Sequence, residues 1–289
     1  MREIRRSRVP VAGERSTALY CPEGGRGLPL VLNLHGTGSG PVEQMRISAL
    51  AEVAGRHGFA VAAPHGSGRS GAGHAWAVPS GGSGPEDGSP SNTAPEHSGP
   101  DDSGIDDSGY LLALIDTLVA AGVADPGRVY AAGMSGGARM ACHLAAAHPG
   151  RIAAVAAVAG LRAPRAQAGN RDAPGVPVIA FHGTADRVNP FDGGGPDYWG
   201  EAVPEALRGW AEANGCASGP RRERVSEHVR LAYAACRGGS DAVLYVVEGG
   251  GHTWPGSRAP FPGLGPVASD LDASEIIWDF FRPRRAGSD

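Results

Sequence analysis

The chain has 289 residues, of which 41% are hydrophobic and 19% are charged. This composition is typical of a globular protein and excludes a chain that is disordered along its whole length. The formal net charge of -4 provides no electrostatic basis for binding nucleic acid or an anionic membrane surface.

The first part of the chain predicts strands that alternate with helices. Residues 2–22 alternate loosely in polarity and indicate two short strands around a turn. Residues 28–34 (LPLVLNL) are mostly apolar, as expected for a strand that is buried on both faces. Residues 41–58 have apolar side chains at helical spacing and begin with a proline, which suits the first turn of a helix. Residues 59–63 predict another buried strand.

A segment of different composition follows. Residues 80–104 consist almost entirely of glycine, serine, proline, aspartate and glutamate. We interpret this segment as a flexible loop inside a domain, because the alternation of strands and helices resumes after it. Residues 1–289 are accordingly predicted to form a single domain.

The second half of the chain continues the alternation. Further helices are predicted at 106–122, from the end of the turn 133–137 through residue 148, at 204–214 and at 269–281. Further strands are predicted at 129–132, 152–159, 176–181 and 242–247. Ser269 or Asp270 would cap the last helix. Strands that alternate with helices in this way predict the α/β class, with a mostly parallel central sheet and helices on both faces.

In such a sheet, functional side chains gather in the turns that follow the carboxyl ends of the strands. The turn Gly133-Met134-Ser135-Gly136-Gly137 matches G-x-S-x-G, the nucleophile elbow. Small residues beside the serine allow a sharp turn from strand to helix and lift Oγ clear of the sheet. Because glycine is frequent in this chain, a plain glycine-rich turn is the alternative, but the flanking strand and helix favour the elbow.

Two later strand ends carry groups that would activate a serine nucleophile. Asp186 lies in the turn after strand 176–181 and could orient a histidine, or simply cap the next turn. His252 lies after strand 242–247 and three glycines, and could be a general base or a histidine without a catalytic role. The chain order of serine, aspartate and histidine is the order found in α/β-hydrolases, which favours a triad.

The turn after strand 28–34 predicts part of an oxyanion hole. In α/β-hydrolases one donor is the N–H after the nucleophile, here Gly136, and the other comes from this turn, here Thr37. Two preorganised donors stabilise the developing oxyanion by several kcal/mol. His35 and His182 each precede a glycine at a strand end, and we interpret them as structural residues that hydrogen-bond neighbouring loops.

Five segments together are similar to a known family. LHGTGSG, RVYAAGMSGGARMA, FHGTADRVNPFDGG, WAEANGC and VEGGGHTWPG resemble the poly(3-hydroxybutyrate) depolymerase/feruloyl esterase family of α/β-hydrolases, over residues 15–282. The resemblance implies a secreted-type serine esterase that acts on aliphatic polyester, feruloyl or acetyl-sugar esters. It implies Ser135 as nucleophile, Asp186 and His252 as its partners, and Thr37 and Gly136 as oxyanion donors.

The chain departs from this family at several positions. Thr37 stands where members often carry a cysteine, and the oxyanion hole should survive because the backbone N–H is the donor. Of the aromatic residues that members often carry after the fourth strand, only Trp76 is present. Trp254 could line the acyl pocket or pack in the core, and Met134 is a further candidate for substrate contact. The chain has no length for a polymer-binding module, so soluble esters are expected over crystalline polymer.

The cysteines and the N-terminus favour different cellular locations. Cys216 and Cys236 match positions that are disulfide-bonded in such families, and a bond would close a loop worth roughly 3 kcal/mol of stability. Disulfides do not persist in a reducing cytosol. Residues 1–13 nevertheless lack the apolar core of a signal peptide. We therefore slightly favour a cytoplasmic location, with a secreted protein whose leader has been removed as the alternative.

The sequence thus predicts a serine carboxylic-ester hydrolase that forms an acyl-enzyme with small or oligomeric esters of hydroxyalkanoate, feruloyl or acetyl type. The same triad could instead serve a thioesterase, a peptidase or an acyl-transfer enzyme of a biosynthetic pathway. A binding module on a degenerate hydrolase fold is a third possibility. We expect no metal, no cofactor, no nucleic-acid partner and no membrane span, and the oligomeric state stays open.

Overall fold

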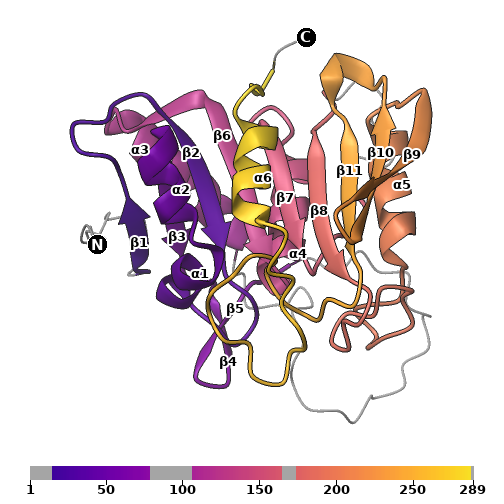
Figure 1. Cartoon of the computed structure of the whole chain (residues 1–289). Helices are drawn as coiled ribbons and strands as arrows, with labels where there is room; N and C mark the ends of the chain where they lie inside the picture. Colours follow the sequence, from indigo (N-terminus) through magenta and orange to yellow (C-terminus); the bar gives the residue numbers. More distant parts are fainter. Residues whose placement is uncertain (1–14, 79–105, 165–173, 288–289) are drawn as a thin grey trace, which may run out of the picture.

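A nine-stranded sheet forms the centre of the computed structural model, which describes residues 15–78, 106–164 and 174–287 (Figure 1). The strand order is β1-β3-β2-β6-β7-β8-β11-β10-β9. The strands are β1 (Thr17–Tyr20), β2 (Leu28–Leu34), β3 (Ala60–Pro64), β6 (Ala124–Met134), β7 (Ala154–Val158), β8 (Val178–Gly183), β9 (Ser218–Val225), β10 (His228–Ala234) and β11 (Ala242–Val247). The six central strands, β3-β2-β6-β7-β8-β11, pair in parallel. The pairs β1–β3, β11–β10 and β10–β9 are antiparallel. The predicted α/β class with a mostly parallel sheet is confirmed.

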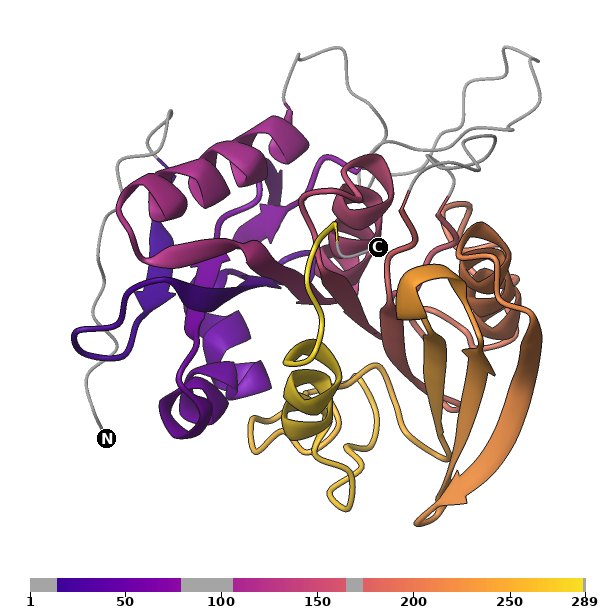
Figure 2. The ribbon, with the colours of Figure 1, turned by 90° about the horizontal axis from the view of Figure 1, so that it is seen from above.

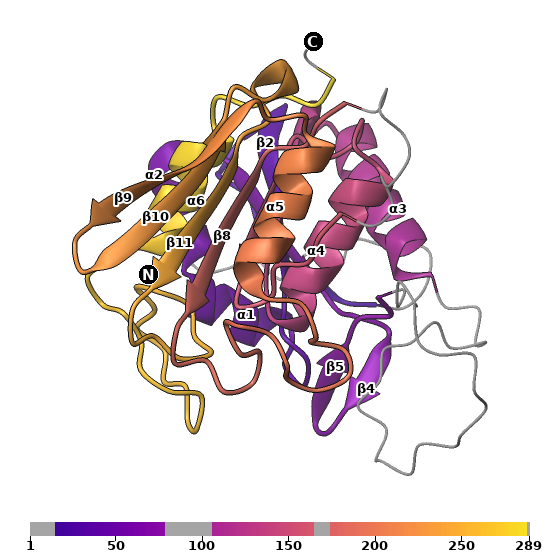
Figure 3. The same cartoon turned by 90° about the vertical axis from the view of Figure 1, so that its right-hand side faces the viewer.

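Helices cover both faces of this sheet (Figures 2 and 3). One face carries α3 (Asp107–Ala120), α4 (Gly136–Ala147) and α5 (Val203–Ala213). The other face carries α1 (Pro41–Ser48), α2 (Leu50–His57) and α6 (Ala273–Phe281). Each face therefore has its own apolar core, and the sheet separates the two.

Strand β2 shows why its residues form an almost continuous apolar run. Successive side chains of a strand point to opposite faces. Leu30, Leu32 and Leu34 pack in the core beneath α3 and α4, while Val31 packs in the core on the α1 and α6 side. All four are fully buried. A central parallel strand needs apolar residues on both faces, and the prediction from sequence rests on this requirement.

Two predicted helices have different boundaries in the structure. The predicted helix 41–58 is interrupted at Ala49, whose φ of 51° lies in the left-handed region, so the chain forms α1 and α2 instead. The last helix begins at Ala273 and not at 269, because the Asp272 carboxylate accepts hydrogen bonds from the N–H groups of the first turn. Neither Ser269 nor Asp270 caps it.

The sequence analysis did not predict two hairpins. Strands β9 and β10 pair at the edge of the sheet, and the short strands β4 (Gly68–Ser70) and β5 (Gly73–Ala75) pair with each other. The side chains of β9 (SGPRRERV) are almost all exposed, so no alternation of apolar residues marks it as a strand. A disulfide between Cys216 and Cys236 joins the two ends of the β9–β10 hairpin.

Some predictions concern residues outside the described ranges. The loop 80–104 and the first of the two strands predicted in 2–22 lie there, so both stay predictions, as does the single domain over 1–289. Among the helices that the structure describes, none combines the length and apolar character needed to cross a bilayer.

Candidate active site

Ser135 lies between the end of β6 and the start of α4. Its φ of 53° and ψ of -117° are strained values for a residue with a side chain. A Cβ atom on Gly137 would lie 2.2 Å from the carbonyl oxygen of Leu34, so only glycine lets α4 begin this close to β2. The N–H of Ser135 donates to the carbonyl oxygen of Val158, 2.8 Å away on β7. The turn therefore holds Ser135 at the carboxyl ends of the central strands.

Asp186 and His252 lie together at the ends of β8 and β11. The Nδ1 atom of His252 is 2.8 Å from Asp186 Oδ2. The other oxygen, Oδ1, accepts the backbone N–H of Asn189 at 2.9 Å. Burial raises the pKa of Asp186, but the hydrogen bonds from His252 and Asn189 outweigh this effect and hold it below its ordinary value. Asp186 is therefore a buried, ionised carboxylate with both oxygens engaged.

The turns around this pair are held by residues with structural contacts. His182 Nε2 hydrogen-bonds the carbonyl oxygen of Asn189 at 2.8 Å, and burial lowers the pKa of His182. The side chain of Asn189 in turn donates to the carbonyl oxygen of Ala159 at 2.7 Å. The sequence analysis missed Asn189; the D-x-x-N spacing, which favours a side-chain-stabilised turn, is the signal that could have found it.

The turn that carries Thr37 lies against the start of α4. A Cβ atom on Gly136 would lie 3.3 Å from the backbone nitrogen of Thr37, so the two predicted oxyanion donors are neighbours. His35 fixes this turn, because its Nε2 accepts the N–H of Gly66 at 3.0 Å and its Nδ1 lies 2.9 Å from the carbonyl oxygen of Gly36. Burial lowers the pKa of His35 to about 4, which keeps the ring neutral and able to accept.

The three residues predicted to contact substrate have different positions. Trp76 is 1% exposed, and its Nε1–H donates to the carbonyl oxygen of His35 at 2.9 Å. Trp254 is also 1% exposed, and its Nε1–H donates to Ser274 Oγ at 3.0 Å. Both indoles lie in the core and neither lines the cavity described next, which corrects the expectation of direct contact. Met134 does line that cavity.

A cavity of about 860 Å³ brings the remaining candidates together. Ser135, His252 and Thr37 all line it, and Asp186 lies behind His252 without lining it. Much of the remaining wall comes from the β4–β5 hairpin, the start of α1 and the loop at 260–264. The structure therefore places the predicted nucleophile, base and oxyanion turn around one space.

Arg139 is a lining residue that the sequence analysis missed. It lies on α4, one turn after Ser135, and is 9% exposed. Its guanidinium carbon is 4.6 Å from the ring centre of Tyr198, which lines the same cavity. The signal in the sequence is an arginine in a helix (GGARMACHLAAA) whose other residues are mostly small or apolar.

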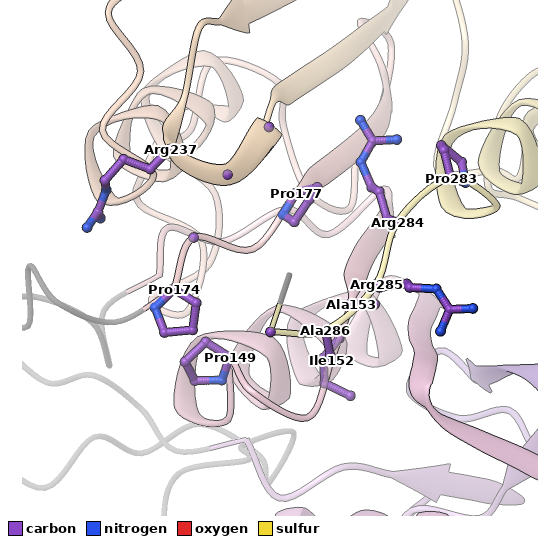
Figure 4. Close-up of a pocket in the computed structure, with 14 residues that line it drawn as sticks. Pro149, Ile152, Ala153, Pro174, Pro177, Arg237, Pro283, Arg284, Arg285 and Ala286 are labelled. Carbon is purple, nitrogen blue, oxygen red and sulfur yellow. The ribbon is translucent and has the colours of Figure 1, made fainter. Parts of the chain in front are cut away.

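A second cavity, of about 570 Å³, lies at the opposite ends of the strands (Figure 4). It is lined by residues that precede β7, β8 and β11, including Ile152, Pro177 and Arg237, and by the segment after α6. None of the candidate catalytic residues lines it. In the described part of the chain, no group of three histidine, cysteine, aspartate or glutamate side chains is arranged to hold a metal ion.

The parallel sheet, the serine elbow and the later aspartate and histidine together define an α/β-hydrolase. A family model described as esterase PHB depolymerase matches residues 15–170. The chain belongs to this esterase family and is a carboxylic ester hydrolase. This confirms the resemblance found in the sequence.

Two curated proteins and two solved structures illustrate the relationship. "Putative esterase NocK" from Nocardia uniformis subsp. tsuyamanensis is 34% identical over 299 residues, which cover 94% of this chain and 80% of that protein. Feruloyl esterase B from Piromyces equi is 31% identical over 136 residues, 44% of this chain and 25% of that protein. An acetyl xylan esterase from Aspergillus awamori has a TM-score of 0.61 at 15% identity, covering 97% of each chain. Esterase PE8 has a TM-score of 0.56 at 18% identity, covering 92% and 99%. The two structures support the fold.

Proposed function

We propose that Ser135, His252 and Asp186 form a catalytic triad that hydrolyses carboxylic esters through an acyl-enzyme. The observation that carries this proposal is the 2.8 Å contact between Asp186 Oδ2 and His252 Nδ1 beside a cavity that Ser135 also lines. Because the carboxylate engages Nδ1–H, the lone pair of the neutral imidazole is on Nε2. That nitrogen is the one available to the serine.

The reaction follows from these positions. His252 Nε2 takes the proton of Ser135 Oγ as Oγ bonds to the ester carbonyl carbon. The N–H groups of Thr37 and Gly136 stabilise the oxyanion that forms. The C–O bond to the alcohol then breaks, and His252 returns the proton to the leaving oxygen. Water repeats these steps on the acyl-enzyme, releases the carboxylic acid and regenerates Ser135.

The proposed substrates are small or oligomeric esters. The cavity of about 860 Å³ has room for a compact acyl group together with part of an alcohol group. The description of the family and the name of the feruloyl esterase relative favour hydroxyalkanoate and feruloyl esters. Acetyl esters belong in the same test, and thioesters and peptide anilides represent the other reactions that a serine triad can perform.

The first prediction concerns the nucleophile. Ser135→Ala should lower kcat on every ester by about four to six orders of magnitude, because it removes the attacking oxygen. The measurement is hydrolysis of p-nitrophenyl acetate, p-nitrophenyl butyrate, methyl ferulate and a soluble 3-hydroxybutyrate trimer by both proteins. Thermal unfolding of the variant should match the wild type.

Labelling by a fluorophosphonate serves as the control for this prediction. The wild type should be labelled at Ser135 and the alanine variant should not. A folded alanine variant that keeps its esterase activity would contradict the triad. A labelled wild type that cleaves thioesters or anilides in preference to esters would retain the triad and reassign the reaction.

A further inference from the structure

Arg139 is charged, buried and without an acidic partner in the ranges that the structure describes. Only 9% of the residue is exposed, and its Nε has no hydrogen-bond partner. Among the described residues, the groups that act on its charge are Arg162 and Tyr198, and neither is a carboxylate. Burying an unpaired guanidinium is unfavourable, so a buried guanidinium of this kind is a candidate binding site for an anionic group that would pair with it.

The cavity supplies no carboxylate of its own to this guanidinium. Among the described residues that line the cavity, Glu43 is the only acidic one, and it forms an ion pair with Arg46. Arg139 is likewise the only arginine in that lining. An anionic group that enters the cavity therefore meets the charge of Arg139, which no carboxylate among the described lining residues neutralises.

The guanidinium also lies close to the proposed oxyanion hole. Its Nη2 is 3.5 Å from the point that a Cβ atom on Gly136 would occupy, and the backbone nitrogen of Thr37 is 3.3 Å from the same point. A group bound to Arg139 would thus lie within a few bonds of an ester carbonyl bound by Thr37 and Gly136. Arg139 can therefore contact the substrate itself and not only the protein around it.

The side chain is held in place before substrate arrives. Its guanidinium carbon lies 4.6 Å above the ring of Tyr198, an arrangement in which the aromatic face orients the cation. Burial, with repulsion from Arg162, lowers the pKa of Arg139 to about 10, so the group stays protonated at neutral pH. Tyr198 is a positioning residue in this arrangement.

We propose that Arg139 binds a carboxylate carried by the ester substrate, so that this enzyme prefers esters with an anionic group near the scissile carbonyl. The proposal rests on the proposed function, because it concerns the same cavity. A guanidinium can donate two parallel hydrogen bonds to a carboxylate, and such charge-assisted bonds are stronger than neutral ones. A preference of about 10- to 100-fold in kcat/KM over a neutral isostere is expected from one such contact.

The test uses pairs of substrates that differ only in charge. Monomethyl glutarate is compared with methyl 4-carbamoylbutanoate, which places a carboxylate or a carboxamide in the acyl part. O-acetylglycolate is compared with O-acetylglycolamide, which places the same groups in the alcohol part. Hydrolysis is followed in a pH-stat for the wild type and the neutral variant Arg139→Met, and the quantity compared is the ratio of kcat/KM within each pair.

The wild type should prefer the anionic member of one pair by about 10- to 100-fold, and the pair concerned identifies which side of the ester lies on Arg139. Arg139→Met should abolish this preference, because kcat/KM for the anionic member should fall about 10- to 100-fold more than kcat/KM for the neutral member. Arg139→Lys should restore part of the preference, because lysine supplies the positive charge but not the bidentate hydrogen-bonding geometry of the guanidinium. Arg151→Met is the matched control, since Arg151 pairs with Asp116 outside the cavity, and it should leave both ratios unchanged.

Three results would overturn the proposal. The first is a wild type that shows no preference in either pair. The second is an Arg139→Met variant that keeps the preference. The third is an Arg139→Met variant that loses activity on charged and neutral esters alike while its melting temperature falls, as expected of a purely structural arginine. These results differ from failure of the proposed function, in which no ester is hydrolysed in a Ser135-dependent manner. In that case calorimetric binding of glutarate to Ser135→Ala, with and without Arg139→Met, tests the anion site independently.

Discussion

At the scale of single residues, Asp186 shows how a buried carboxylate is kept ionised and directed. Its side chain is not exposed, and both of its oxygens accept hydrogen bonds. One of these bonds comes from the backbone N–H of Asn189 in the same turn, so the position of the carboxylate does not depend on His252 alone. The proposed role of Asp186 therefore depends on its ability to accept from Nδ1–H.

Asp186→Asn tests that role. An asparagine amide can present an N–H to His252 Nδ1, which would leave the lone pair on the wrong ring nitrogen. We expect kcat for p-nitrophenyl acetate to fall by about 10⁴-fold while the fold is retained. The control is Asp192→Asn, which changes an exposed carboxylate in the same loop. An Asp186→Asn variant within tenfold of the wild type would exclude the proposed triad.

The residues of the proposed triad could be selected from sequence, whereas Arg139 and the indoles could not. Ser135, Asp186 and His252 each follow a recognisable buried strand, so the local pattern places them at one edge of the sheet. Whether Trp76 or Trp254 contacts the substrate or the core depends on which segments pack against it. The same is true of Arg139, whose significance lies in the lack of a nearby carboxylate among the described residues.

At the scale of elements, the β9–β10 hairpin is the clearest case of structure that the sequence pattern does not reveal. Its outer strand is exposed and polar, and it is held by its pairing with β10. The disulfide between Cys216 and Cys236 closes the hairpin, with a sequence separation of 20. This bond should stabilise the edge of the sheet by restricting the unfolded chain.

Removing the bond should lower stability. The double variant Cys216→Ser/Cys236→Ser is expected to lose roughly 3 kcal/mol of unfolding free energy, as the loop-entropy relation gives for a loop of about this length. The measurement is denaturant unfolding with and without dithiothreitol. The reductant should destabilise the wild type and leave the double variant unchanged. Equal stability of the oxidised wild type and the double variant would show that the bond contributes nothing.

The break between α1 and α2 has a different cause. The apolar spacing of residues 41–58 continues through Ala49, so the pattern predicts one helix. The structure places Ala49 in the left-handed region, which most residues other than glycine avoid. Both short helices pack in the same core on one face of the sheet, and the local apolar pattern does not predict the break between them.

At the scale of the whole molecule, ionised carboxylates join segments that are distant in the chain. Asp186 at the end of β8 contacts His252 after β11, and Glu275 on α6 pairs with Arg56 on α2. Burial raises the pKa of each carboxyl, but the hydrogen bonds from their partners outweigh this effect, and both pKa values lie below the ordinary range. The protein is therefore more stable when these groups are ionised.

The sign of the pH dependence follows from these shifts. A carboxyl whose pKa is lower in the folded protein contributes stability that is complete above its unfolded pKa, about 3.9 for aspartate, and that is lost as the pH falls through the folded value. The free energy of unfolding should therefore decrease steadily below about pH 4. Asp186→Asn should lose less over the same interval.

Urea unfolding at pH 6, 4 and 3 measures this dependence. The comparison is the change in unfolding free energy of each protein between pH 6 and pH 3, not the absolute stability, because the variant also loses hydrogen bonds. If the wild type and Asp186→Asn lose the same amount, Asp186 does not have a depressed pKa in the folded protein.

The sequence by itself determined the α/β class, the succession of the central strands and helices along the chain, the family and the turn that carries each proposed catalytic residue. It could do so because buried parallel strands need apolar runs, and because sharp turns after them need glycine. Only the tertiary structure decided the helix break at Ala49, the polar edge hairpin, the core positions of Trp76 and Trp254 and the place of Arg139 in the cavity wall. These features depend on which distant segments meet, and that information is not contained in any local pattern.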